Sequence, residues 1–223
     1  MLRLQTVESK NSVVEFTEPG NKFRRVEHHY QPLTGGFAFA CHGKMVVSLK
    51  NLCSDIGGVE QQKSGNIVVM LEAGEHPLMN PIEYILESIK TIYSIKHKNG
   101  AIRRVNVNIA ATTVENYRKL RDAGIGTYIL FQETYNKENY LALHPTGPKS
   151  NYEWHTEAMD RAMQGGIDDV GIGVLFGLET YRYDLIGLLM HAEHLEATYG
   201  VGPHTISVPR LCKARNILCR SRN

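Results

Sequence analysis

The chain has 223 residues, with 25 Lys and Arg residues, 23 Asp and Glu residues and a formal net charge of +2. Apolar residues make up 42% and charged residues 22%, values close to those of an ordinary globular domain. This composition excludes an intrinsically disordered chain, because enough apolar side chain is present to offset the entropy lost on folding. No stretch approaches the ~18 consecutive apolar residues of a membrane-spanning helix.

Positive charge is concentrated in the last fourteen residues. They contain no acidic residue and five basic ones: Arg210, Lys213, Arg215, Arg220 and Arg222. The preceding 209 residues therefore carry a net charge of about −3. Because a short basic tail is typical of a solvated chain end, we expect neither a nucleic-acid partner nor a membrane partner.

The cysteines predict no disulfide framework and no zinc site. They are Cys41, Cys53, Cys212 and Cys219. Their spacings fit neither a CxxC pair nor a zinc framework, and four cysteines so far apart are too few for a disulfide-stapled secreted fold. The first sixteen residues also lack the apolar segment of a secretory signal.

From Ile67 onward, short apolar runs alternate with helical patterns. The predicted strands are 67–71, 105–109, 127–131, 169–175 and 204–208. The predicted helices are 81–98, 114–123, 152–163 and 183–198. Asn80 and Thr113 are expected to cap the first two helices. The last helix is expected to bury an apolar face made of Leu185, Leu188, Leu189 and Leu195. Five strands that alternate with four helices predict a parallel sheet with helical crossovers.

Strand 105–109 distinguishes a barrel from an open sheet. Val105, Val107 and Ile109 share one face, and Asn106 and Asn108 share the other. In a barrel, the outer face packs on helices and the inner face can be polar, whereas a doubly wound sheet buries both faces as apolar runs. No GxGxxG or P-loop follows any strand. We therefore predict an α/β fold, a partial (β/α) TIM-type barrel with five or six of eight β/α units.

Barrel enzymes place their functional residues at the carboxyl ends of strands. Here these ends carry carboxylates, amides and one Arg, in the segments 72–75, 108–112, 132–134, 176–179 and 207–210. The absence of Lys at these ends weakens a Schiff-base aldolase, and the absence of His weakens a zinc or iron hydrolase. Each position also has a structural alternative, because Glu72 and Glu75 could cap the next helix and Gln132 and Glu133 could be solvated loop residues.

Several stretches carry a family resemblance over about residues 68 to 211. The sequence resembles the tyrosine lyases that mature FeFe hydrogenases in IRRVNVNIAATTVENYRKLRDAGIGTYILFQETY, AMDRAM, GIDDVGIGVLFGLETYRYD, LLMHAEHLE and GVGPHTISVPRL. These enzymes belong to the radical S-adenosylmethionine (SAM) superfamily and are related to 2-iminoacetate synthase of thiamine synthesis. The resemblance implies a radical-enzyme barrel in which a 4Fe-4S cluster binds SAM and cleaves it to a 5′-deoxyadenosyl radical.

The implied reaction is a carbon–carbon cleavage of tyrosine. The radical abstracts hydrogen from tyrosine, and cleavage gives p-cresol and dehydroglycine. Dehydroglycine then yields carbon monoxide and cyanide for the hydrogenase H-cluster. The implied partners are therefore tyrosine, SAM and other hydrogenase maturation proteins. The implied location is the cytoplasm or, in a eukaryote, a hydrogenosome, a mitochondrion-like organelle or a plastid.

The resemblance also assigns residues that bind SAM, although it identifies no catalytic residue. Gly74 and Glu75 are similar to the GE motif, which holds the methionyl ammonium group. Gln132 and Glu133 occupy the positions that hold the ribose hydroxyls. The other expected residues of the SAM cavity are Asn106, Asn108, Gly171 and Gly173.

Three further residues are assigned to the substrate and to a second metal. Ser207 and Arg210 are expected to bind the carboxylate of tyrosine, because Arg can form a bidentate pair with a carboxylate. His204 begins its strand and so lies at the opposite end of the barrel. Family members bind an auxiliary cluster with an extra iron there, so His204 is either a ligand of that iron or an ordinary loop histidine.

Two departures from the family pattern predict that this chain is inactive alone. The superfamily motif CxxxCxxC is absent, and Cys41 and Cys53 do not reproduce it. A 4Fe-4S cluster needs such thiolates. The sequence also leaves the family pattern after Leu211. We therefore expect a truncated member with a divergent region at 1–66, a barrel core at 67–211 and a basic tail at 212–223. The alternative to an enzyme is a cluster-free fragment or binding remnant.

Overall fold

The computed structural model describes residues 67–75, 78, 80–94, 96–97 and 100–211, together with five short strands before residue 39. The chain divides into unit 1, made of Met1–Ala110 and Arg118–Tyr128, and unit 2, made of Ala111–Tyr117 and Ile129–Asn223. All four cysteines, the apolar run at 45–49 and the basic tail at 212–223 lie outside the described residues.

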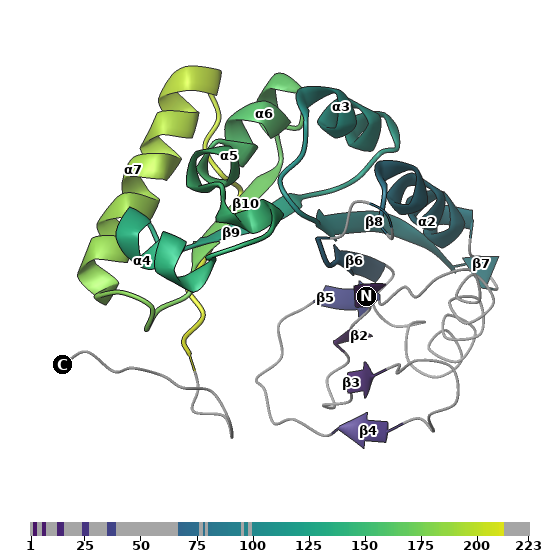
Figure 1. Ribbon diagram of the computed structural model, residues 1–223. Helices are drawn as coiled ribbons and strands as arrows, with labels where there is room; N and C mark the ends of the chain where they lie inside the picture. Colours follow the sequence, from purple (N-terminus) through teal and green to yellow (C-terminus); the bar gives the residue numbers. More distant parts are fainter. Residues whose placement is uncertain are drawn as a thin grey trace. The chain divides into compact units, whose positions relative to one another are not determined.

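Unit 1 is built on a sheet with the strand order β8-β6-β5-β2 (Figure 1). Its strands are β1 (Leu2–Arg3), β2 (Thr6–Val7), β5 (Gly35–Ala38), β6 (Ile67–Ala73), β7 (Lys96–His97) and β8 (Gly100–Asn108). β5, β6 and β8 pair in parallel, whereas β1, β2 and β7 pair antiparallel with their neighbours. β3 (Val13–Glu15) and β4 (Arg24–Val26) form a separate pair.

In unit 2, strand β10 lies between β9 and β11. The elements are β9 (Tyr128–Glu133), α4 (Lys137–Leu143), the 3-10 turn η1 (Pro148–Ser150), α5 (Tyr152–Thr156), α6 (Ala158–Gln164), β10 (Val170–Val174), α7 (Tyr181–Tyr199) and β11 (Thr205–Ser207). β10 and β11 pair in parallel, and α6 and α7 pack against β10 and against each other. Tyr128, the first residue of β9, belongs to unit 1 and pairs in parallel with Val107.

The predicted order of strands and helices is confirmed with two exceptions: β7 lies within the predicted helix 81–98, and helix α4 was not predicted. The five expected strands are present as β6, β8, β9, β10 and β11, and helices α2 (Ile82–Ser94) and α3 (Val114–Asp122) follow the first two of them. The alternation predicted for β8 is also present, since Val105 and Val107 are fully buried while Asn106 and Asn108 are half-buried. The chain therefore has the predicted α/β class, with parallel strands joined through helices.

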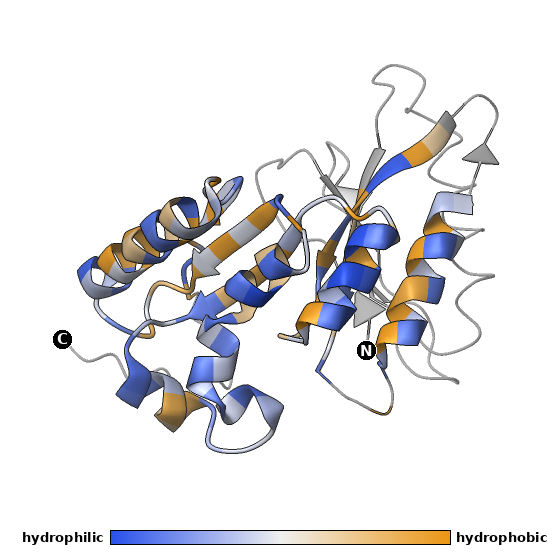
Figure 2. Ribbon diagram, turned by 90° about the horizontal axis from the view of Figure 1, so that it is seen from above, coloured by the Kyte–Doolittle hydropathy of each residue, from blue (hydrophilic) through white to orange (hydrophobic). Residues whose placement is uncertain are grey.

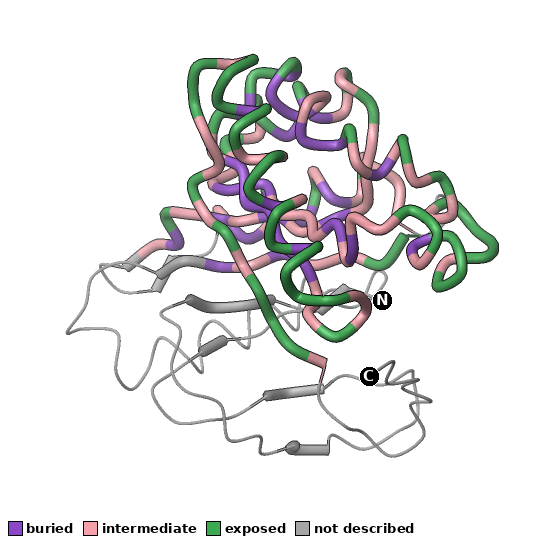
Figure 3. The backbone as a smooth tube through the Cα atoms, turned by 90° about the vertical axis from the view of Figure 1, so that its left-hand side faces the viewer, coloured by how far each residue is buried: buried purple, intermediate pink, exposed green. Residues whose placement is uncertain are grey.

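Helix α2 shows why an apolar stripe is enough to fix a helix on a sheet. Ile85, Ile89 and Ile92 recur at helical spacing, are at most 1% exposed, and lie on a helix that packs against β8. Buried and exposed residues alternate along the helices in Figure 3, and Figure 2 shows apolar and polar residues on each of them. Burying three isoleucine side chains contributes on the order of 5 to 9 kcal/mol to the folded state.

The first helix cap differs from the prediction, and the second agrees with it. Helix α2 begins at Ile82, and the carbonyl oxygen of Pro81 accepts the first helical hydrogen bonds. Pro81 rather than Asn80 therefore stands at the position before the first helical residue, and the side-chain amide of Asn80 donates to the carbonyl oxygen of Gly74 at 2.8 Å. Helix α3 has the predicted cap, since Thr113 Oγ1 accepts from the backbone N–H of Asn116 at 3.2 Å.

The predicted helix at 152–163 is two helices, α5 and α6, separated at Glu157. A continuous helix would use the carbonyl oxygen of Trp154 within its own ladder. Here the guanidinium group of Arg161 donates to that carbonyl oxygen instead. The side chain of Arg161 therefore competes with the helix backbone, which is the kind of interaction that breaks a helix without a Pro or Gly signal.

The apolar face predicted for α7 is only half correct. Leu188 and Leu195 are fully buried, but Leu185 is 38% and Leu189 48% exposed. The two buried leucines are seven residues apart, so the buried face of α7 is narrow. Asp184 on the same helix is also fully buried. Among the described residues, none of the helices combines the length and the apolar character that crossing a membrane requires.

His155 is a buried histidine that makes the stability of unit 2 sensitive to pH. Its side chain on α5 is 5% exposed, and its Nε2 lies 2.8 Å from the carbonyl oxygen of Phe131. Burial lowers the pKa of His155 from its ordinary value of 6.5 to about 4. Burial likewise lowers the pKa of His191 on α7 to about 4.

We expect the free energy of unfolding to fall as the pH is lowered from 7 to 4.5. The unfolded chain takes up a proton near pH 6.5, whereas the folded chain resists protonation of both histidines down to about pH 4. Each histidine contributes a slope approaching ~1.4 kcal/mol per pH unit in this window. Replacing His155 by Gln should remove about half of that slope, measured by urea unfolding at several pH values. An unchanged slope in H155Q would contradict a buried neutral His155.

Candidate functional site

The carboxyl end of β6 in unit 1 exposes the predicted GE motif. Gly74 and Glu75 directly follow the strand and are both exposed. The bond from Asn80 to the carbonyl oxygen of Gly74 closes the turn that carries them. Glu75 is therefore an exposed residue directly beyond the carboxyl end of β6.

Asn106 and Asn108 lie on the neighbouring strand β8, where they pair in register with Met70 and Glu72 of β6. Both are half-buried. The side-chain oxygen of Asn106 accepts hydrogen bonds from Arg104 Nε at 3.1 Å and from the backbone N–H of Thr127 at 3.0 Å. Asn106 therefore fixes the chain that enters β9, in addition to its position on the predicted inner face.

Glu133 ends strand β9 in unit 2 with an unusual backbone conformation. Its φ is +69°, and it is the one non-glycine residue with positive φ in the described part of the chain. Such a conformation costs about 1 kcal/mol or more for a residue with a Cβ and persists only where neighbouring contacts enforce it. Its carbonyl oxygen accepts from the backbone N–H of Leu175 at 2.9 Å, which fixes this turn at the end of β10.

The side chain of Glu133 is held by a lysine from a distant part of the loop. Lys149 Nζ donates to Glu133 Oε1 at 2.5 Å, and the two side chains are 32% and 22% exposed. No hydrogen bond to Glu133 Oε2 is formed by any residue that the structure describes. The carboxylate therefore presents one oxygen that can still accept a hydrogen bond.

Gln132 has a structural role, which the sequence does not reveal. It is 4% exposed, and its Nε2 donates to Thr156 Oγ1 on α5 at 2.9 Å. Of the two residues predicted to hold ribose hydroxyls, Glu133 is therefore the more accessible one.

The glycines of β10 make room for the chain itself. A Cβ added to Gly173 would lie 2.6 Å from the carbonyl oxygen of Ser207 and 2.7 Å from the ring of Phe131. Gly173 is therefore required for the packing of β9 and β11 against β10. Gly171 is buried in the same strand, opposite Thr205.

Ser207 and Arg210 lie at the carboxyl end of β11. Ser207 pairs with Gly173, and Arg210 forms an isolated parallel bridge with Phe176. The backbone N–H of Phe176 donates to the carbonyl oxygen of Pro209 at 2.8 Å, which ties the segment after β11 to the segment after β10. Ser207 is half-buried and Arg210 is exposed, so the predicted carboxylate-binding residues lie on one short, fixed segment.

His204 lies at the opposite end of β11, as the sequence predicted. Its ring is 67% exposed, its Nδ1 lies 3.7 Å from the carboxylate of Asp169, and its backbone N–H donates to Val170. No group of three or more His, Cys, Asp or Glu side chains that could hold a metal occurs among the described residues. The role of His204 as a ligand of auxiliary iron therefore stays a prediction.

Two acidic residues after β10 fix the loop after β9, and sequence reasoning missed both contacts. Glu179 accepts from the side chains of Asn136 at 2.8 Å and Asn139 at 2.5 Å. Asp184 Oδ1 accepts from Thr134 Oγ1 at 2.8 Å and from the backbone N–H of Tyr135 at 2.9 Å. Asn136 caps the short helix α4, in a segment for which the sequence predicted no helix.

Asp184 and His191 also hold Tyr135 between them on the inner side of α7. Burial raises the pKa of Asp184, and burial also raises the pKa of Tyr135. The Tyr135 hydroxyl and His191 Nδ1 form a hydrogen bond of 2.8 Å. Asp184 Oδ2 and His191 Nε2 remain buried without a hydrogen-bond partner in the described structure.

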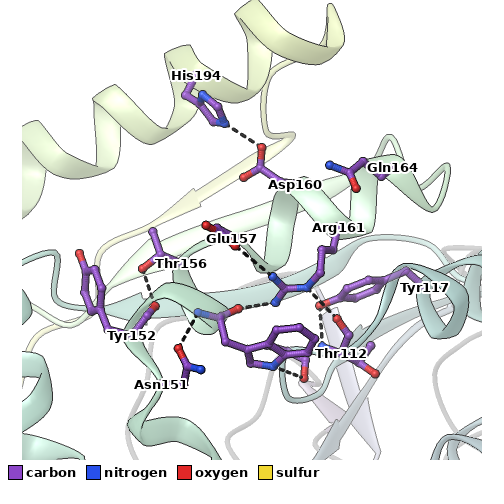
Figure 4. A network of polar contacts seen from close by, with 12 residues as sticks. Thr112, Tyr117, Asn151, Tyr152, Thr156, Glu157, Asp160, Arg161, Gln164 and His194 are labelled. Atoms are coloured by element: carbon purple, nitrogen blue, oxygen red, sulfur yellow. Dashed lines mark hydrogen bonds and ion pairs between the residues drawn. The ribbon is translucent and has the colours of Figure 1, made fainter.

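Arg161 organises the segment that precedes α3 in unit 2 (Figure 4). Figure 4 shows its guanidinium group between Thr112 and Glu157, and it lies over the ring of Trp154 at 3.7 Å. Arg161 Nε donates to the carbonyl oxygen of Thr112 at 2.9 Å, and Trp154 Nε1 donates to that of Ala111 at 3.4 Å. The 111–112 segment is therefore fixed by side chains from α5 and α6.

Comparisons with known proteins identify the family. The model of the Radical SAM superfamily matches residues 58–188. The 2-iminoacetate synthase of Salmonella typhimurium is 28% identical over 151 residues, which are 67% of this chain and 38% of that protein. The corresponding Escherichia coli enzyme is 28% identical over 144 residues, 64% of this chain and 37% of its own. This chain thus spans less than two fifths of the length of these curated relatives.

Solved structures give a closer match. HydG, a maturase of the FeFe hydrogenase, is 50% identical, with a TM-score of 0.71 over 89% of this chain and 39% of its own. The HydG of Carboxydothermus hydrogenoformans is 40% identical, with a TM-score of 0.67 over 83% of this chain and 40% of its own. Methylornithine synthase, at 20% identity and a TM-score of 0.54, supports the fold alone. The predicted resemblance and the class of a partial radical-enzyme TIM-type barrel are confirmed.

The given sequence does not contain the motif CxxxCxxC, whose cysteines hold the 4Fe-4S cluster in that superfamily. Such a cluster is held by closely spaced thiolates. Cys41 and Cys53 are twelve positions apart, and Cys212 and Cys219 are seven apart, so neither pair gives a CxxC step. No step of a reaction is therefore assigned to a cluster in this chain.

The backbone of Glu133 can be tested with two substitutions that remove the same carboxylate. Ala at this position must adopt φ near +69°, which is strained, whereas Gly adopts it freely. We expect Glu133→Gly to be more stable than Glu133→Ala by about 1 kcal/mol, after the greater flexibility of unfolded Gly is included. Urea unfolding of both variants measures this difference, and an Ala variant as stable as the Gly variant would rule out the left-handed turn.

Proposed function

Because this chain belongs to the radical SAM superfamily, we propose that it carries the SAM- and tyrosine-binding core of a tyrosine lyase that serves FeFe-hydrogenase maturation. The full reaction of such a lyase produces p-cresol and dehydroglycine and supplies carbon monoxide and cyanide to the H-cluster. Support comes from the 50% identity with HydG over most of this chain. The partners under this proposal are SAM, tyrosine and other hydrogenase maturation proteins.

The observation that carries the proposal is the carboxylate of Glu133. It follows a parallel strand, it lies in a left-handed turn of the kind found at functional sites, and its Oε2 is not used by the described residues. A carboxylate with one unused oxygen is suited to accept a hydrogen bond from a ribose hydroxyl. We assign Glu133 to the ribose of SAM, with Gln132 as the buried support beside it.

The other assignments follow the strand ends of each unit. In unit 1, the Glu75 carboxylate and the Gly74 backbone are assigned to the methionyl ammonium, and Asn106 and Asn108 to the lining of the cavity. In unit 2, the strand that carries Gly171 and Gly173 is assigned to the adenine. Since the space beside Gly173 is filled by Phe131, the backbone of the strand rather than an open hollow is the proposed contact.

Ser207 and Arg210 are assigned to the carboxylate of tyrosine. Arg210 is exposed on a segment that the Phe176 bridge holds in place. A guanidinium group is suited to form a bidentate pair with a carboxylate. Ser207 is close in sequence and half-buried, and its hydroxyl can donate to the same group.

A second candidate function is a cluster-free binding protein derived from the lyase. The spacing of the four cysteines favours it, because this spacing does not reproduce CxxxCxxC. Under this reading the chain binds SAM or tyrosine and does not cleave either of them by itself.

Substrate binding can be tested without a cluster. We expect L-tyrosine to bind the purified protein in isothermal titration calorimetry, and Arg210→Met to weaken that binding about tenfold or more, because a charge-assisted pair is lost. Arg182→Met is the matched control, since exposed Arg182 lies over the ring of Tyr181 and is not assigned to substrate. Equal affinities in wild type and R210M would contradict the assignment of Arg210.

Cluster formation tests whether this chain cleaves SAM by itself. We expect anaerobic reconstitution with iron and sulfide to give no cluster by visible absorbance or by EPR, and no 5′-deoxyadenosine from SAM under reducing conditions, because three suitably spaced thiolates are missing. A stable cluster signal together with 5′-deoxyadenosine would instead establish the chain as an active radical enzyme.

A further inference from the structure

The pair between Glu133 and Lys149 is better fixed than an ordinary surface ion pair. Lys149 belongs to η1, and the hydroxyl of Tyr140 donates to the carbonyl oxygen of Lys149 at 2.7 Å. Tyr140 is fully buried, so this bond anchors the backbone of Lys149 to the core of unit 2. Gly147, with φ of +85°, makes the turn that brings η1 back toward β9.

Glu133 is fixed from the other side. Its backbone is held by the bond from Leu175, and the next residue, Thr134, is tied to buried Asp184. With the backbone fixed, only the side-chain torsions of Glu133 remain free. The Lys149 ammonium group on Oε1 limits these torsions, so that Oε2 points in a defined direction.

From this geometry we propose that Lys149 is a positioning residue, which holds the Glu133 carboxylate so that Oε2 accepts a hydrogen bond from a ribose hydroxyl of the bound adenosyl group. This inference rests on the proposed function, because it uses the assignment of Glu133 to ribose. Under this inference, recognition of the ribose depends on Lys149, which lies sixteen residues after Glu133 in the sequence and does not contact the ligand.

The same loop offers a matched control. Lys137 pairs with Glu153, also sixteen residues apart, and both of these side chains are more than half exposed. This second pair has the same chemistry and lies in the same connection between β9 and β10, but neither residue is assigned to a ligand. A loss of loop order would affect both pairs, whereas a role in ribose recognition belongs to Lys149 alone.

The test compares two ligands by isothermal titration calorimetry: S-adenosylhomocysteine and its 2′,3′-dideoxy analogue. In wild type we expect the hydroxylated ligand to bind at least tenfold more tightly. In Lys149→Met the preference should fall to about threefold or less, while the affinity for the dideoxy analogue is unchanged. Lys149→Arg should restore the preference, and Lys137→Met should leave both affinities as in wild type. Thermal melting followed by circular dichroism checks that each variant folds.

Glu133→Gln separates failure of this inference from failure of the proposed function. If E133Q keeps the wild-type preference for the hydroxylated ligand, the assignment of Glu133 to ribose is wrong. If E133Q loses the preference but K149M keeps it, the positioning role is overturned while the ribose assignment stands. An equal loss in K149M and K137M, or an equal loss of affinity for both ligands in K149M, would also overturn the positioning role.

Discussion

The turn at Glu133 is the constraint on which the candidate site of unit 2 depends. At this residue strand β9 leaves the sheet in a left-handed conformation, and the following connection, with α4, η1 and α5, must return to the sheet. The turn is strained, so it is maintained by bonds on both sides: the backbone bond from Leu175 and the ion pair with Lys149. These two contacts therefore fix the direction of the Glu133 carboxylate. A binding site needs functional groups that are held in a fixed direction.

The segment after β10 supplies the second part of this arrangement. Glu179 binds Asn136 and Asn139, and Asp184 binds Thr134 and Tyr135, so two acids fix the start of the connection. Burial raises the pKa of Asp184, whereas its two hydrogen bonds favour the charged form. Removing one partner of such a contact would leave a buried polar group unpaired, which costs about 1 to 3 kcal/mol.

The fold could be predicted from the sequence because its signals are local. The alternation of Val105, Asn106 and Val107 and the spacing of the isoleucines in α2 depend on neighbours a few residues away. The failures depended on distant contacts: Arg161 divides a predicted helix by binding Trp154, and Lys149 reaches Glu133 across sixteen residues without any periodic pattern. The resemblance assigned both Glu133 and Gln132 to the ribose hydroxyls. It did not distinguish their roles, because the hydrogen bond from Gln132 Nε2 to Thr156 is another distant contact.

The proposed role of Glu133 is to accept a hydrogen bond from a ribose hydroxyl of SAM, and this role does not require the 4Fe-4S cluster. A crystal structure of this protein with S-adenosylhomocysteine tests the claim most directly. The account predicts a ribose hydroxyl within hydrogen-bond distance of Glu133 Oε2, with Lys149 still on Oε1 and with φ of Glu133 positive. A ribose bound away from Glu133, or a Glu133 with negative φ and no contact to Lys149, would contradict it.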